Sequence, residues 1–162
     1  KAIFNNVSII NSRFEKMSFT DVEFGNCNFS NTTFDNCSFI RCEFNNCKLT
    51  GCNFIENVLF DIGFIDSNIG YANISTSNLR GILFKNTSIR SGSLQENKVK
   101  NIIFKEADLT GTQFFKTSLN GIDLSNSNIE QIAISLEDIK GAKINQMQAI
   151  DLMYLLGVKV VE

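Results

Sequence analysis

Four cysteines stand at intervals of five residues in the N-terminal half of the chain, at Cys37, Cys42, Cys47 and Cys52. Four thiolates can hold one zinc ion when all the sulfurs converge at about 2.3 Å from it, and structural sites usually take them from closely spaced pairs. A regular spacing of five residues does not form such pairs, and cysteine is also a common small residue of protein cores. Zinc binding and core packing are therefore the two alternatives, and the elements that carry the cysteines must decide between them.

The apolar residues of the chain share the same interval of five. Starting from Phe4 and ending at Ile144, every fifth residue is Phe, Ile, Leu or Val. A short period that persists over this length indicates an internal repeat, and a repeat determines the fold of the whole chain. The cysteines stand two residues before members of this apolar series, so they belong to a second column of the same repeat.

The second column consists mainly of small residues, and a third column is rich in turn formers. Two residues before each large apolar residue the chain carries mostly Ala, Cys, Ser or Thr, and two residues after it the chain favours Asn, Asp and Gly. Asn, Asp and Gly tolerate a positive φ angle. Each unit of five thus predicts a short extended segment with one small and one large inward side chain, followed by a corner. One such segment cannot bury its apolar side alone, so we expect successive units to stack as a solenoid.

This pattern resembles that of the pentapeptide-repeat family, whose consensus is Ala-(Asp/Asn)-Leu-x-x. The closest copies are Ala107-Asp108-Leu109-Thr110-Gly111, Ala72-Asn73-Ile74 and Cys27-Asn28-Phe29-Ser30-Asn31, and the resemblance extends from residue 2 to about residue 145. It implies an all-β fold, a right-handed quadrilateral β-helix of about seven coils with four units in each. The four cysteines then lie on the four sides of one coil, where core packing explains them better than a zinc site does.

Asn57, Asn97 and Glu137 interrupt the column of small residues and are separated by 40 residues each. Residues that stand a multiple of 20 apart in a four-sided coil lie on one side, so these three share a side. They mark either local distortions of the coil or polar groups with satisfied hydrogen bonds, and we favour these interpretations over an inward polar site. Because the period never slips between Phe4 and Ile144, we expect no inserted loop.

The period ends at Ile144, so residues 1–144 predict the β-helix and residues 145–162 a separate C-terminal element. Asn145 and Gln148 have the spacing of a capping box at the start of a helix that ends at Leu156. Gly157 is a typical residue after a helix end, and the stretch from Val158 to Val160 alternates like a short strand.

The expected C-terminal helix is apolar around most of its circumference. A helix that only covers the last coil needs a single apolar stripe, so the excess indicates a second contact. The resemblance implies a two-fold homodimer, which we expect to form through Met153, Tyr154, Leu156, Val158 and Val160. The alternative is a monomeric cap with apolar residues on its rim.

The composition argues against several classes of function. The chain has no His, and 17 acidic residues against 15 basic ones give a net charge of −2. The absence of His removes the most common general base and metal ligand, and no phosphate-binding loop is recognisable. We therefore expect no enzyme, no metal and no cofactor. The balanced charge argues against direct binding of nucleic acid or membrane. The odd number of cysteines and the lack of a leader segment favour the cytoplasm.

After these exclusions, we expect the function to be the binding of other proteins by the outer wall of the solenoid. The resemblance points to the Qnr-type and mycobacterial fluoroquinolone-resistance proteins, dimeric rods that bind bacterial DNA gyrase and topoisomerase IV and imitate DNA with an acidic face. The acidic candidates on one side of this chain are Glu23, Glu43 and Asp66, although Lys85 and Lys105 follow on the same side. Two hypotheses remain open: a topoisomerase-binding protein connected with quinolone resistance, and a general interaction scaffold with another protein partner.

Overall fold

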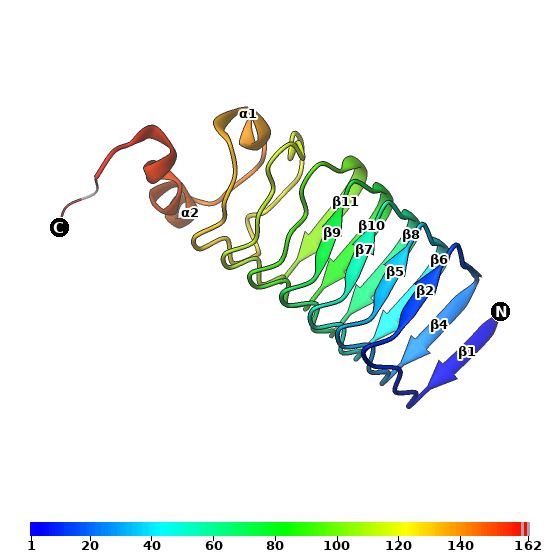
Figure 1. Cartoon of the computed structure of the whole chain (residues 1–162). Helices are drawn as coiled ribbons and strands as arrows, with labels where there is room; N and C mark the ends of the chain where they lie inside the picture. Colours follow the sequence, from blue (N-terminus) through cyan, green and yellow to red (C-terminus); the bar gives the residue numbers. More distant parts are fainter. Residues whose placement is uncertain (160, 162) are drawn as a thin grey trace.

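The computed structural model describes residues 1–159 and 161 and shows a β-solenoid whose two ends carry the two termini (Figure 1). Its strands, in chain order, are β1 (Ala2–Asn5), β2 (Arg13–Glu15), β3 (Ser18–Thr20), β4 (Val22–Gly25), β5 (Thr33–Asp35), β6 (Ser38–Asn45), β7 (Asn53–Ile55), β8 (Val58–Ile65), β9 (Asn73–Ser75), β10 (Asn78–Lys85) and β11 (Lys98–Lys105). The helical elements follow at the C-terminal end, as α1 (Leu136–Ile139), α2 (Gln146–Asp151) and the 3-10 helix η1 (Met153–Leu156).

The strands form two parallel sheets in which each residue pairs with the residue 20 positions later. The larger sheet has the order β1-β4-β6-β8-β10-β11, with β3 also paired to β6, and the smaller has the order β2-β5-β7-β9. Strand pairing thus joins six layers and spans five turns. Isolated parallel bridges continue the same register as far as Asp123 and Lys143. The predicted four-sided solenoid with a 20-residue coil is confirmed.

The residues of the apolar column fill the interior. Phe24, Phe44 and Phe64 are 5%, 1% and 0% exposed, and their rings stack on one another with centroids 4.7 Å and 5.1 Å apart. The stack continues through Phe84 and Phe104. Offset aromatic stacking adds to the free energy of apolar burial, so this column is a major source of stability.

The corners use the left-handed backbone region that the third column predicts. Asparagines such as Asn26, Asn46 and Asn86 have φ angles of 52°, 52° and 48°, and Gly51 has 69°. Larger residues also occupy such corners, including Tyr71 at 59°. An L-residue other than Asn, Asp or Gly adopts this conformation at a cost, which the surrounding ladder of hydrogen bonds offsets.

The C-terminal part differs from the prediction in three ways. Glu137 does not face inward, because it lies exposed on the short helix α1. The single helix expected to end at Leu156 is instead α2 followed by η1. The expected strand at Val158 and Val160 is wrong for Val158, which has no strand pairing, and Val160 lies outside the described residues.

Other predictions for this region are confirmed. Both hydrogen bonds of the capping box between Asn145 and Gln148 are present at the start of α2. Gly157 follows η1 with a left-handed φ of 68°. The 20-residue register passes α1 without a slip, since Leu119 still donates to the carbonyl of Asp138 and Leu124 to that of Lys143. Among the described residues, no helix is long and apolar enough to cross a membrane.

Candidate functional site

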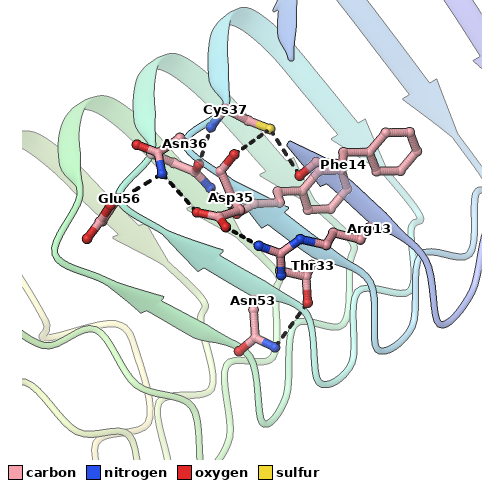
Figure 2. A network of polar contacts seen from close by, with 10 residues as sticks. Arg13, Phe14, Thr33, Asp35, Asn36, Cys37, Asn53 and Glu56 are labelled. Atoms are coloured by element: carbon pink, nitrogen blue, oxygen red, sulfur yellow. Dashed lines mark hydrogen bonds and ion pairs between the residues drawn. The ribbon is translucent and has the colours of Figure 1, made fainter. Parts of the chain in front are cut away.

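The cysteines are buried in the interior as free thiols, and they donate hydrogen bonds to backbone carbonyls. The Cys37 Sγ lies 3.6 Å from the carbonyl oxygen of Phe14 in the preceding coil and 3.4 Å from that of Asp35 (Figure 2). The Cys52 Sγ lies 2.9 Å from the carbonyl oxygen of Phe29. Each thiol is thus bonded to its own side of the solenoid and not directed to a shared point.

The ionisation of these thiols also disfavours metal binding. Burial raises the pKa of Cys47 to about 11 and that of Cys52 to about 12, and it also raises the pKa of Cys42. Zinc binds the thiolate, which these groups do not form near neutral pH. Within residues 1–159 and 161, no group of three or more potential ligands is placed to hold a metal ion. Core packing is the interpretation that the geometry supports.

Asn57 and Asn97 face the interior and have satisfied hydrogen bonds. The Asn57 Oδ1 accepts from the Cys37 backbone N–H at 2.6 Å, and its Nδ2 donates to the Phe34 carbonyl at 3.0 Å. Asn97 repeats this arrangement two coils later. Each amide therefore bridges two backbone groups of the preceding coil, and the interpretation as satisfied polar groups is confirmed.

The charged residues on the wall of the smaller sheet are bonded to other residues of the same wall. Arg13 forms an ion pair with Asp35, and Asn36 donates to Asp35 at 2.9 Å and to Glu56 at 3.3 Å (Figure 2). The contacts of Arg13 with Asp35 and of Asn36 with Glu56 connect successive coils. A wall whose charged side chains are paired in this way offers few unpaired charged groups to a protein partner.

The wall on the side of Phe4, Phe24 and Phe44 carries the predicted acidic residues, and we call it the charged wall. Glu23 on β4 and Glu43 on β6 are direct neighbours in the parallel register. Asp66 stands apart from them, because it occupies the corner after β8 with a φ of 50° and accepts a hydrogen bond from Asn86 at 2.7 Å. The structure thus brings Glu23 and Glu43 together and separates Asp66.

A groove of about 540 Å³ runs along the charged wall beside these two glutamates. Gly63 and Gly81 also line it, and the side chains of Glu43 and Asp61 lie over these two glycines, in the space that a Cβ atom would need. The other lining residues are Lys1, Asp21, Val22, Glu23, Arg41, Cys42, Glu43, Asp61, Ile62, Ile65 and Leu83.

The charges of the groove are only partly paired. Lys1 lies 2.9 Å from Glu23, and Arg41 forms two hydrogen bonds with Asp21, at 2.6 Å and 2.8 Å. The Arg41 hydrogen bonds lower the pKa of Asp21, and the Glu23 hydrogen bond raises the pKa of Lys1. Among the described residues, Glu43 and Asp61 form no ion pair, and Glu43 accepts from Asn45 at 2.5 Å. The groove can therefore bind a cationic group beside an apolar one.

Sequence reasoning missed Asp61 as a neighbour of Glu43, because the repeat assigns them to different sides. Arg41 and Asp61 are corner residues with φ angles of 52° and 56°, yet they lie inside the continuous strands β6 and β8. At such a corner the side chain projects toward the next side. No sequence signal marks these strands as continuous, because the segments VLFDIGFI and NLRGILFK carry an aspartate or a glycine at the corner, as other units do.

The C-terminal surface has two kinds of apolar residue. Leu152 and Leu155 pack against the core, and the Tyr154 hydroxyl donates to the Ile132 carbonyl. Met153 is half-buried. Leu156 and Val158 are 62% and 47% exposed. Tyr154 is therefore partly a cap residue, whereas Leu156 and Val158 remain available for a further contact.

Comparison with family models identifies the repeat over most of the chain. The pentapeptide repeat region model matches residues 17–94 and 37–114, and the model of eight pentapeptide repeats matches residues 99–131. None of the curated protein sequences is significantly similar to the chain.

Solved structures provide distant likenesses. HetL, a pentapeptide repeat protein involved in heterocyst differentiation regulation in Nostoc sp. strain PCC 7120, is 16% identical, with 88% of this chain and 84% of that chain covered and a TM-score of 0.44. AT2G44920, a pentapeptide repeat protein from the Arabidopsis thaliana thylakoid lumen, is 14% identical, with 86% and 77% covered and a TM-score of 0.47. Full-length QnrB1, a plasmid-mediated fluoroquinolone resistance protein, is 18% identical, with 96% and 100% covered and a TM-score of 0.33.

Proposed function

Because the chain belongs to the pentapeptide-repeat family, we propose that it is a non-enzymatic binding protein whose charged wall contacts a protein partner. The interior is filled by apolar side chains and by polar groups bonded to the backbone, so only the outside meets other molecules. The observation that carries the proposal is the groove at Glu23 and Glu43. It combines carboxylates with the apolar side chains of Ile65 and Leu83.

The partner that we propose to test first is a bacterial type II topoisomerase, DNA gyrase or topoisomerase IV. Stacked carboxylates at the layer spacing of a sheet, about 4.8 Å, present negative charge to a basic DNA-binding surface. In this proposal Glu23 and Glu43 make the central contact and Asp66 an outlying one. The free cysteines fit a reducing cytoplasm, which is where the proposal places the protein.

A supercoiling assay with purified gyrase tests this partner directly. We expect micromolar protein either to inhibit supercoiling or to protect the enzyme from a fluoroquinolone. The double variant Glu23→Lys, Glu43→Lys should lose the effect, while Glu15→Lys, an exposed position on β2 of the other sheet, should retain it. Absence of both inhibition and protection with wild-type protein would exclude gyrase as the partner.

A second candidate is an interaction scaffold with a partner other than a topoisomerase. The basic residues Lys85 and Lys105 favour it, because they stand in register on the same wall and interrupt the negative face that an imitation of DNA requires. Affinity capture with the wild type and with the Glu23→Lys, Glu43→Lys variant distinguishes the two candidates. Recovery of a protein unrelated to topoisomerases, lost in the variant, would support the scaffold.

We also propose that the element of residues 145–162 forms a homodimer contact. The exposed Leu156 and Val158 support it, with Met153, Tyr154 and Val160 as further members of the predicted interface. Analytical ultracentrifugation of Leu156→Asp is the test. A dimer that is unchanged by this substitution, or a wild-type monomer, would contradict the contact.

A further inference from the structure

The last strand of the solenoid, β11, carries basic side chains that have no acidic partner (Figure 1). Lys100 stands opposite Arg80 of β10 in the parallel register, and Lys105 stands opposite Lys85. All four side chains are exposed. Like charges in direct opposition destabilise a sheet. Within the described part of the chain none of the four forms an ion pair, so an external anion that binds between them removes this cost.

An apolar pair lies between these cations. Leu83 on β10 and Ile103 on β11 are register partners, and Ile103 is 57% exposed. Each of the two strands therefore presents a cation, an apolar side chain and a second cation in the same order. We call this set of six residues the β11 patch, which consists of Arg80, Leu83, Lys85, Lys100, Ile103 and Lys105.

The outer edge of β11 has no strand beside it. Its strand partner is β10, and among the described residues no parallel bridge or backbone hydrogen bond joins it to residues 118–125 of the next coil. Another side of the same coil does continue, because Asp108 pairs with Asn128. Opposite β11, the Ile122 N–H donates instead to the Leu119 carbonyl at 3.0 Å. An unpaired strand edge of this kind is a docking place for an extended segment of another protein.

Two hollows lie between β11 and the next coil. The first, of about 280 Å³, contains Lys100 in its lining, and the second, of about 360 Å³, contains Lys105. Ile102 and Ile122 line both hollows. They are 8% and 9% exposed, whereas the residues that correspond to Ile102 in the two preceding coils are each 1% exposed. The hollows therefore reach apolar side chains of the interior and have a lysine of the β11 patch beside each of them.

We propose that the β11 patch and the two hollows bind an extended segment of another protein in which acidic and apolar side chains alternate. Successive side chains of an extended segment point to opposite sides. When the segment lies along β11, its carboxylates reach Lys100 and Lys105, and its apolar side chains enter the hollows at Ile102 and Ile122. The exposed Ile103 adds an apolar contact between the two lysines.

The same features argue against other anionic partners. A nucleic-acid backbone supplies negative charge but no aliphatic side chain for the hollows, and a membrane surface is too flat to enter them. The second hollow is also lined by the carboxylate of Asp123, which accepts from the Ser125 backbone N–H at 2.9 Å. This carboxylate repels anions that bind by charge alone, so the apolar contacts are needed for tight binding.

This binding surface goes beyond the proposed function, because it takes a partner of opposite charge to the one that fits the groove at Glu23 and Glu43. The groove and the β11 patch share Leu83, so substitutions that separate them must avoid this residue. Ile103, Lys100 and Lys105 do not line the groove. Their substitution therefore changes the β11 patch alone.

The test is fluorescence anisotropy with a labelled eight-residue peptide of alternating Glu and Val, which has the length of β11. A peptide of alternating Lys and Val is the control ligand, and we expect saturable binding of the acidic peptide only. Lys100→Glu and Lys105→Glu should each weaken this binding about tenfold or more, and Ile103→Ser about tenfold. Lys48→Glu, at an exposed lysine on another side of the solenoid, is the matched control and should bind as the wild type does.

Three results would overturn the inference. They are the absence of saturable binding of the acidic peptide, an Ile103→Ser variant that binds it as tightly as the wild type, and equal affinity for short single-stranded DNA or for phosphatidylserine vesicles. Circular dichroism verifies that the variants are folded. The double variant Glu23→Lys, Glu43→Lys should retain the peptide, so that loss of its effect on gyrase with peptide binding intact distinguishes the groove from the β11 patch.

Discussion

The coils up to Lys105 and the coils from Glu106 to Ile144 share one repeat but differ in structure. The first region contains every strand of both sheets, whereas the second is joined only by isolated bridges. The corners differ as well. In the second region Thr117, Ile122, Ser127 and Ile132 each donate a backbone hydrogen bond to the residue three positions earlier, which closes a turn on each successive side. In the first region such a turn closes one side of each coil only, at Thr32, Cys52, Ala72 and Gly92.

The two regions form different corners because the small inward residues of the first region often find a side-chain hydrogen-bond acceptor in the next coil. In the first region the N–H of a small inward residue often donates to a side chain 20 residues later, as Cys47 does to Ser67 Oγ at 2.9 Å and Ser77 to Asn97 Oδ1 at 2.9 Å. Thr117 and Ser127 have no such acceptor, because the residues 20 positions later, Glu137 and Met147, are exposed on α1 and α2. Their N–H groups bond within a turn instead. The form of a corner thus depends on a side chain of the next coil.

Truncation of the ring stack should produce the largest contrast between the two regions. Phe44→Ala removes a fully buried ring that stacks on Phe24 and Phe64, and we expect it to lower the free energy of unfolding by about 4 kcal/mol. Leu124→Ala, in the same column of the second region, should cost about 3 kcal/mol. Urea denaturation measures both. A larger loss for Leu124→Ala would mean that the aromatic column is not the main source of stability.

Removal of one inward amide tests whether the hydrogen bonds from inward side chains to the backbone of the preceding coil stabilise the solenoid. Asn57→Ala leaves the Cys37 N–H and the Phe34 carbonyl without partners, and since each unsatisfied buried group costs about 1–3 kcal/mol, we expect a loss of about 3 kcal/mol. Asn57→Ser should lose less, because Ser77 in the same column both accepts from Asn57 N–H and donates to the Phe54 carbonyl.

The matched control for this amide is Asn53→Ala. Asn53 is only partly buried, and its side chain makes one long contact with Thr33 Oγ1 at 3.5 Å (Figure 2). We expect a change within about 0.5 kcal/mol in urea denaturation. Equal losses in the free energy of unfolding for the two alanine variants would show that the inward hydrogen bonds of Asn57 do not stabilise the solenoid.

The last coil is closed by a side chain, and its removal should have a smaller and more local effect. Gln148 Nε2 donates to the carbonyls of Leu124 and Ser127 at 2.8 Å and 2.6 Å. We expect Gln148→Ala to cost about 2 kcal/mol and to increase hydrogen exchange in α2 and η1 but not in β6. Gln146→Ala, exposed on the same helix, is the control. Exchange that rises equally in β6 would show that the two regions unfold as one unit.

The period of five was sufficient to predict the inward columns, the corners and the coil length, because each depends on residue type at a fixed spacing. It was not sufficient to place Glu137, since the apolar spacing of Ile134 and Ile139 is the same whether the segment between them is extended or forms α1. It also missed the groove. That feature depends on Asp61 turning a corner inside a strand and on Gly63 lacking a side chain. Both are properties of single residues, which the pattern of the repeat does not describe. The cap at Asn145 and Gln148 was predictable because a capping box involves only near neighbours.

Alkaline pH should weaken the first region most, because all five cysteines lie between residues 27 and 52. Burial raises the pKa of Cys52 from 9.0 to about 12. Between these values the folded chain holds a proton that the unfolded chain has released, so the free energy of unfolding falls as the pH rises above 9.0. From pH 8 to pH 10 this thiol should account for a loss of about 1 kcal/mol. Urea denaturation in reducing buffer should show that Cys52→Ala loses less stability than wild type over this interval. If the two lose the same amount, the folded chain admits the thiolate, and the interior at Cys52 is more open to water than the packing of Phe29 and Phe54 indicates.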